Sequence, residues 1–93
     1  MAREFEWDSV KAERNLRKHG VSFEEAASVY GDPNRVELVD ANHSEREDRD
    51  IVIGHSTRTK LLMVVTTERH EAIRIIIARK ANANEARVYA QGC

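Results

Sequence analysis

A polar face near the N-terminus carries residue types that could bind an anion and transfer a proton. Lys11, Asn15 and Lys18 recur at i, i+4 and i+7, so a helix would place all three on one side. His19 would lie beside the end of that helix. A lysine ammonium can contact anionic oxygen atoms, and histidine exchanges protons near neutral pH. The same spacing also fits a solvated face on which His19 caps backbone carbonyls, so the pattern alone leaves both interpretations open.

Arginines in the second half of the chain form another group of candidates. Arg74 and Arg79 fall in a strongly apolar segment, where a guanidinium is costly unless it meets an anion. A phosphate would meet this need, because the planar fork of arginine matches two anionic oxygen atoms. A structural ion pair of Arg79 with Glu85 or Glu68 would meet it equally well.

The charge distribution is that of one small domain with two unlike halves. Ninety-three residues are enough for a single modest core. Residues 1–50 carry 8 Lys and Arg against 13 Asp and Glu, a net of −5, whereas residues 51–93 carry 7 against 3, a net of +4. This polarity suits a domain that binds a polyanion on its basic side, although a solvated surface of mixed charge explains the same counts.

Several protein classes fit the sequence poorly. No apolar run approaches the ~20 residues needed to span a bilayer, and the N-terminus has no apolar signal region, so we expect a cytoplasmic protein without a membrane partner. Cys93 is the only cysteine, which excludes an internal disulfide and a cysteine-based metal cage. His43, His55 and His70 fall on different expected elements, so we expect no metal site and no cofactor.

Two helices are expected at the start of the chain. Val10–His19 contains no helix breaker, and Asp8 or Ser9 can cap its first turn. Gly20 supplies the left-handed residue that ends a helix. Ser22, three residues before a glutamate, is typical of a capping box that begins the second helix.

Four strands and a last helix are expected to follow. Short polar connectors favour antiparallel hairpins between the strands, and Asn82 with Glu85 resembles a second capping pair before a helix over Glu85–Ala90. Alternation along the last strand would place Ala78 and Ile75 on opposite faces. The order predicts an α+β domain with helices packed on a four-stranded antiparallel sheet. The expected strands are Arg35–Val39, Ile51–Ser56, Lys60–Thr67 and Ala72–Arg79.

Several motifs at characteristic separations extend along nearly the whole chain. They are FEWD (Phe5–Asp8), NLRKHGVSFEEA (Asn15–Ala26), DP (Asp32–Pro33), HSEREDR (His43–Arg49) and RHEAIRIIIARKANANEARVY (Arg69–Tyr89). Together they resemble the BrnT family of type II toxins, which is similar in fold to the RelE-type ribonucleases. The resemblance implies a RelE-like ribonuclease that blocks translation by cutting RNA without a metal ion, through attack of the 2′-hydroxyl on its own phosphodiester.

The resemblance also gives the candidate residues specific roles. Such a reaction needs cations around the phosphate and groups that move protons at the 2′- and 5′-oxygen atoms. His43, in the charged loop Asp40–Asp50, is an alternative proton carrier to His19, and core packing is the simplest role for Trp7. The catalytic candidates are Arg69, Arg79, His19 and Lys18, and the RNA-binding candidates are Arg58, Lys60, Arg74, Lys11 and Trp7.

The expected partners follow from the same resemblance. They are an RNA substrate, a BrnA-like antitoxin and, only through the antitoxin complex, operator DNA; a homodimer within that complex is also compatible with it. The alternative that the residues leave open is a non-catalytic module that binds RNA, DNA or a protein through the same basic face.

Overall fold

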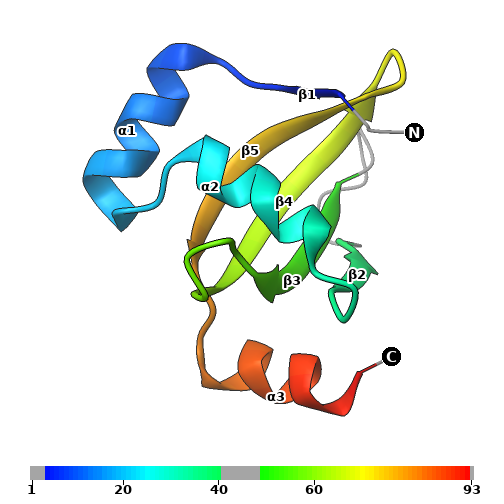
Figure 1. Cartoon of the computed structure of the whole chain (residues 1–93). Coiled ribbons are helices and arrows are strands. Elements are labelled where there is room, and N and C mark those ends of the chain that lie inside the picture. Colours follow the sequence, from blue (N-terminus) through cyan, green and yellow to red (C-terminus); the bar gives the residue numbers. More distant parts are fainter. Residues whose placement is uncertain (1–3, 41–48, 93) are drawn as a thin grey trace.

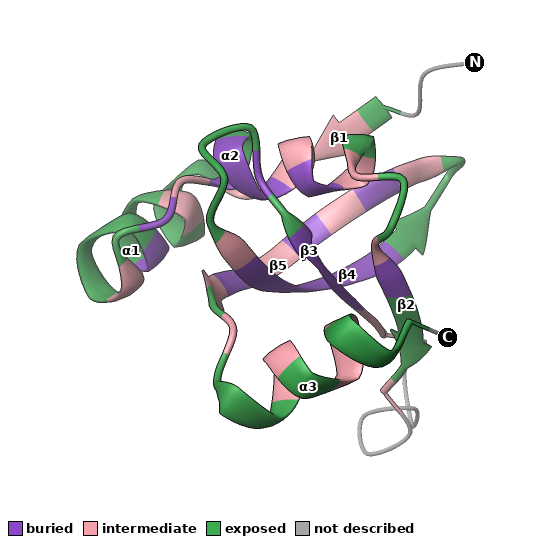
Figure 2. Ribbon diagram, turned by 60° about the horizontal axis from the view of Figure 1, so that its bottom comes forward, coloured by how far each residue is buried: buried purple, intermediate pink, exposed green. Residues whose placement is uncertain are grey.

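Helices cover both faces of a central sheet in the computed structural model, which describes residues 4–40 and 49–92 (Figure 1). The helices α1 and α2 lie on the opposite side of the sheet from α3 (Figures 1 and 2). No helix among the described residues is long and apolar enough to cross a membrane. In chain order the elements are β1 (Glu4–Glu6), α1 (Ser9–His19), α2 (Phe23–Ser28), the short 3-10 helix η1 (Val29–Gly31), β2 (Val36–Val39), β3 (Asp50–His55), β4 (Leu61–Arg69), β5 (Ala72–Lys80) and α3 (Ala83–Gln91).

The sheet has five strands, not the four expected from the sequence, and it is mixed. Its order is β1-β5-β4-β3-β2, in which β2 through β5 are antiparallel neighbours as predicted. The extra strand β1 pairs in parallel with β5, with Phe5 opposite Ile73. A strand of only three residues gives no recognisable alternation, and its partner lies far along the chain, so the sequence pattern did not reveal it.

A β-bulge overturns the expected alternation along β5. Val65 of β4 pairs with Ile77, but the next residue, Thr66, pairs with Ile75, so Ile76 is an extra residue in the ladder. Beyond this point the side chains change face. Ile75 and Ala78 are therefore both buried in the core beneath the N-terminal helices, although alternation placed them on opposite faces.

The helix ends follow the predicted chemistry, with one difference. Asp8 is the N-cap of α1, and hydrogen bonds from the Lys11 and then the Val10 backbone amide lower the pKa of its carboxyl group. Gly20 ends α1 in the left-handed conformation, at φ 71°. Ser22 caps α2 by accepting from the amide of Glu25. The Glu25 carboxylate does not complete the expected box on this cap: it accepts a hydrogen bond from a serine of the β3–β4 hairpin.

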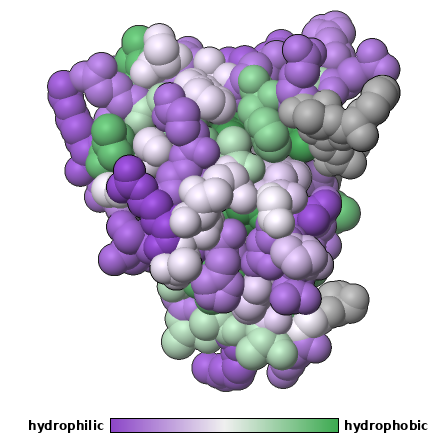
Figure 3. Space-filling view, in the orientation of Figure 1, coloured by the Kyte–Doolittle hydropathy of each residue, from purple (hydrophilic) through white to green (hydrophobic). Residues whose placement is uncertain are grey.

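Two apolar layers sandwich the sheet. The layer beneath α2 is built from fully buried residues such as Phe23, Leu62 and Val64, and Trp7 packs edge-on against Phe23 at 6.0 Å between ring centroids. The layer on the α3 side is thinner and centres on Ile53, Met63 and Val65. No residue of α3 is itself fully buried, so this helix lies on the surface (Figure 2). The face shown in Figure 3 is mostly hydrophilic, with isolated hydrophobic residues.

Candidate functional site

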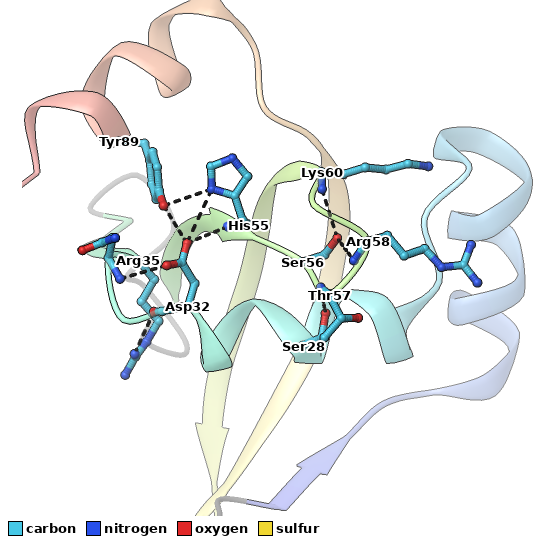
Figure 4. Close-up of polar contacts among 10 residues, drawn as sticks. Ser28, Asp32, Arg35, His55, Ser56, Thr57, Arg58, Lys60 and Tyr89 are labelled. Atoms are coloured by element: carbon cyan, nitrogen blue, oxygen red, sulfur yellow. Dashed lines mark hydrogen bonds and ion pairs between the residues drawn. The ribbon is translucent and has the colours of Figure 1, made fainter.

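Three side chains from distant segments meet beside α3. Asp32 follows η1, His55 ends β3, and Tyr89 lies on α3 (Figure 4). The Tyr89 hydroxyl donates to Asp32 Oδ2 at 2.7 Å and lies 3.0 Å from His55 Nδ1. The imidazole Nδ1 is also 3.7 Å from the same carboxylate oxygen. An imidazole, a phenol and a carboxylate are thus linked at one place.

The hydrogen-bond directions assign a role to each imidazole nitrogen. Tyr89 has a single hydroxyl proton and donates it to Asp32, so its oxygen can only accept from His55 Nδ1. Neutral His55 then carries its proton on Nδ1, and Nε2 is a free acceptor with no partner among the residues that the structure describes. The His55 side chain is 46% exposed, so Nε2 can meet a ligand from solvent.

Both groups behind the imidazole have shifted pKa values. Burial raises the pKa of Asp32, but hydrogen bonds from the His55 amide, the Tyr89 hydroxyl and the Asn34 amide outweigh it and lower that pKa overall. The hydrogen bond to Asp32 is the main reason why the pKa of Tyr89 is raised. At neutral pH, Asp32 is therefore an anion and Tyr89 a neutral donor.

Close backbone packing holds Asp32 against β3. A Cβ atom at Gly54 would lie 2.8 Å from Val29 Cγ1, 3.1 Å from Arg35 Cβ and 3.3 Å from Asp32 Oδ2. Only glycine lets the turn after η1 approach the strand this closely. The backbone amide of His55 then donates to Asp32 Oδ2 at 2.8 Å, which fixes the carboxylate.

A pocket of about 280 Å³ opens beside this cluster, and the β3–β4 hairpin forms one of its walls. Ser56 Oγ donates to the buried Glu25 carboxylate at 2.8 Å and accepts from the backbone amide of Arg58, which ties the hairpin to α2. In Figure 4, the Arg58 and Lys60 side chains extend away from the imidazole. The lining residues are Ser28, Gly31, Asp32, His55, Ser56 and Thr57.

A second pocket, of about 220 Å³, lies between α1 and β5, and we call it the α1 groove. It brings together Lys11, Lys18 and His19, as their spacing predicted, and adds Arg14, which the sequence reasoning missed although it stands three residues after Lys11. None of these four side chains forms an ion pair with an acidic residue in the described part of the chain. The remaining lining residues are Asn15, Ile76 and Ile77.

The three arginine candidates of β4 and β5 do not gather in one place. Arg79 lies in the α3-side layer opposite Met63, and its guanidinium forms a two-pronged ion pair with Glu85 at 2.8 and 2.9 Å. Arg74 forms an ion pair with Glu6 at 3.1 Å. Arg69 lies at the β4–β5 turn, ~23 Å along the strand from Arg79, so these two arginines cannot contact the same phosphate group.

The other candidates are dispersed. Trp7 contributes to the core through Phe23, which is the structural alternative expected for it. His43 lies outside the described residues. In the described part of the chain, no three His, Cys, Asp or Glu side chains lie close enough to hold a metal ion together.

Comparisons with protein families and with solved structures show which proteins this chain is similar to. A family model described as "Ribonuclease toxin, BrnT, of type II toxin-antitoxin system" matches residues 7–85. The chain belongs to the BrnT family. The crystal structure of the Brucella abortus ribonuclease toxin BrnT shares the fold, with a TM-score of 0.64 and 20% sequence identity over 87% of this chain and 99% of that one. No curated protein sequence matches the chain.

Membership of the BrnT family confirms the resemblance seen in the sequence. The family consists of ribonuclease toxins of type II toxin–antitoxin systems, which implies an antitoxin partner. Within this BrnT-family chain, Asp32 and His55 fall inside the matched residues, whereas Tyr89 lies beyond residue 85. In the sequence, Asp32 was recognised as part of the DP motif, and Tyr89 as part of the expected last helix. No spacing or motif in the sequence linked either residue to His55.

Proposed function

We propose that this protein is an endoribonuclease toxin that cleaves RNA without a metal ion, by attack of the 2′-hydroxyl on the adjacent phosphodiester. The observation that carries the proposal is the α1 groove, in which Lys11, Arg14 and Lys18 line a common pocket and form no ion pair with a described acidic residue. A row of unpaired cations beside a pocket suits the repeated phosphates of an RNA strand.

The donor set of the groove favours chemistry that does not use a divalent ion. Mg²⁺ and Ca²⁺ bind carboxylate and carbonyl oxygen atoms, whereas this groove presents ammonium and guanidinium groups, which repel cations. The ammonium and guanidinium groups attract the phosphates of an RNA strand and can hold it on the protein. Lys18 is the proposed phosphate contact nearest to His19, which the sequence nominates as a proton carrier.

The remaining basic candidates extend the RNA path in the proposal. Arg58 and Lys60 on the β3–β4 hairpin are exposed, and they can contact phosphates that flank the cleaved one. Arg69 is exposed at the far turn and can bind only a more distant phosphate. Arg74 and Arg79 would have to exchange their glutamate partners for phosphate oxygen atoms in order to bind RNA.

A BrnA-like antitoxin is the proposed partner. A toxin must be neutralised by the cell that makes it, and an acidic segment of the antitoxin can compete with RNA for the basic groove. Operator DNA would be bound only through the antitoxin in such a complex. Co-expression with the adjacent reading frame tests this pairing: the neighbour should co-purify with the toxin and relieve growth arrest, and failure of both outcomes would remove the support for it.

Incubation of the purified protein with total RNA, and separately with translating ribosomes, tests the enzymatic proposal. Both reactions are run in EDTA, and we expect new RNA ends that carry a 2′,3′-cyclic phosphate. Retention of RNA without cleavage in either reaction would favour the alternative, a binding module that uses the same groove. Cleavage that appears only when a divalent metal is added would contradict the metal-independent mechanism.

A further inference from the structure

We propose that His55 is the residue that accepts the proton of the 2′-hydroxyl, and that Tyr89 and Asp32 are its positioning residues. This inference rests on the proposed RNA cleavage and assigns its proton transfer to the pocket beside α3. His19 in the α1 groove, the carrier that the sequence nominated, then becomes an RNA-binding residue.

Orientation distinguishes the two histidines. The His55 ring is fixed by the Tyr89 hydroxyl 3.0 Å from Nδ1 and by edge-on packing against the Tyr89 ring at 5.0 Å between centroids. No hydrogen bond to a described residue fixes the ring of His19. A general base must be held in hydrogen-bonding range of the proton it removes, so the fixed imidazole is the better placed of the two.

Charge also favours His55. Asp32 lies behind the imidazole with its side chain only 8% exposed, and its Oδ2 is 3.7 Å from Nδ1. A shielded carboxylate at this distance stabilises the imidazolium that forms when Nε2 takes a proton. Tyr89 bridges the two groups and selects the tautomer in which Nε2 is free.

The surroundings of His55 can accept part of a nucleotide. The imidazole borders the pocket of about 280 Å³, whose other walls carry the hydroxyl groups of Ser28, Ser56 and Thr57. Among the residues that the structure describes, the titratable groups in contact with the imidazole are Asp32 from the turn after η1 and Tyr89 from α3. The nearest charged side chains on the hairpin, Arg58 and Lys60, extend away from the ring in Figure 4.

The proposed step conserves atoms and charge. Nε2 of His55 takes the proton of the 2′-hydroxyl as that oxygen forms a bond to phosphorus, and the bond between phosphorus and the 5′-oxygen breaks. The leaving 5′-oxygen takes a proton from solvent. The products are a 2′,3′-cyclic phosphate, a 5′-hydroxyl end and an imidazolium that returns its proton to water.

Single-turnover cleavage by His55→Ala, measured across pH with the same RNA, tests the assignment. We expect a rate lower by on the order of 10²-fold or more, with little change in RNA affinity, and loss of the acid limb of the pH–rate profile. Added imidazole should restore part of the rate to the variant, because a free base can enter the vacated space. Tyr89→Phe, which keeps the ring but not the hydroxyl, should lower kcat and leave KM nearly unchanged.

His70→Asn is the matched control, because His70 is an exposed histidine at the β4–β5 turn and asparagine tolerates its positive φ of 51°. It should cleave as the wild type does. Circular dichroism identifies any variant that fails to fold, and His55→Gln then serves as the second test. A folded His55 variant with an unchanged rate and an intact acid limb would overturn the inference and leave RNA cleavage standing. Absence of cleavage by the wild type would overturn both.

Discussion

Asn15 of α1 and Ala78 of β5 are joined by two hydrogen bonds. The Asn15 side chain donates to the Ala78 carbonyl at 2.8 Å, and the Ala78 amide donates back to Asn15 Oδ1 at 3.2 Å. β1 pairs only with Ala72–Arg74, so the outer edge of β5 has no strand beside Ala78. The Asn15 side chain supplies the missing backbone partner there and attaches α1, with its groove, to the sheet.

Replacement of Asn15 by alanine should destabilise the fold. It would leave buried backbone groups of Ala78, and the Val21 carbonyl, without their hydrogen-bond partner. We expect the free energy of unfolding to fall by ~2–3 kcal/mol in urea titrations. Arg17→Ala, on the exposed face of the same helix, should change it by only about 0.5 kcal/mol or less. Equal stability of the two variants would contradict the anchoring role of Asn15.

Gly54→Ala should strain the site itself. The new methyl group would collide with Val29 and crowd Asp32, so we expect a loss of ~1–3 kcal/mol in the free energy of unfolding and slower RNA cleavage. Gly31→Ala is the stability control, because nothing lies within 4 Å of a Cβ atom at that position. If both variants unfold at the wild-type denaturant concentration, Gly54 is not needed for close packing.

Lys18→Ala and Arg17→Ala remove one positive charge each from the same turn of α1. Only Lys18 lines the α1 groove, whereas Arg17 is paired with Glu13 and largely exposed. Loss of Lys18 should weaken RNA binding and reduce the slope of log affinity against log salt by about 0.7, the value for one phosphate contact on a single strand. Filter-binding titrations at several salt concentrations measure this slope. The same change in slope for Arg17→Ala would indicate that RNA is attracted to the positive charge of α1 in general and is not bound specifically in the α1 groove.

Arg79→Ala should abolish growth arrest. This loss could come from a missing phosphate contact or from a missing ion pair with Glu85, and Glu85→Gln distinguishes the two. If Arg79 contacts a phosphate, its removal should lower the cleavage rate on the order of 10²-fold. Glutamine at position 85 keeps the capping geometry of α3 but weakens the ion pair, so this variant should remain toxic. Loss of toxicity in both variants would show that the ion pair acts through the docking of α3.

Arg69→Ala, at the far turn, should also abolish growth arrest if its phosphate contact is needed.

A fall in pH should lower the stability of the fold, because it protonates two carboxyl groups that hold α3 in place, Asp32 and Glu85. For Asp32 and Glu85, burial raises the pKa, but hydrogen bonds and nearby positive charge outweigh it, so both pKa values lie below their usual 3.8 and 4.5. A carboxyl with a lowered pKa in the folded state stabilises the fold above its unfolded pKa, and this stabilisation is lost as the pH falls. Melting temperatures should therefore drop below about pH 4.5, and less steeply in Glu85→Gln. If the melting temperature of Glu85→Gln falls with pH as steeply as that of the wild type, Glu85 does not contribute to the pH dependence of stability.

Local chemistry allowed much of the fold to be predicted from the sequence. Asp8, Gly20 and Ser22 act on residues within three or four positions of themselves, so their capping roles are visible in a short stretch of sequence. The apolar segments of β2 to β5 are long enough to show as strands, and short polar connectors make antiparallel pairing the simplest arrangement. The spacing of Lys11 and Lys18 likewise placed both on one face of a helix, because a helix has a fixed period, and the structure shows that this face borders a groove.

The features that join distant segments could not be predicted from local sequence. The parallel pairing of β1, the bulge at Ile76 and the meeting of Asp32, His55 and Tyr89 depend on contacts between residues up to dozens of positions apart. No local period encodes such contacts, since each arises from how the layers pack once the chain has folded. The family, the capped helices and the shared basic face of α1 could therefore be predicted from the sequence, whereas the packing of α3 and the η1 turn against β3 determined which histidine is held beside a carboxylate.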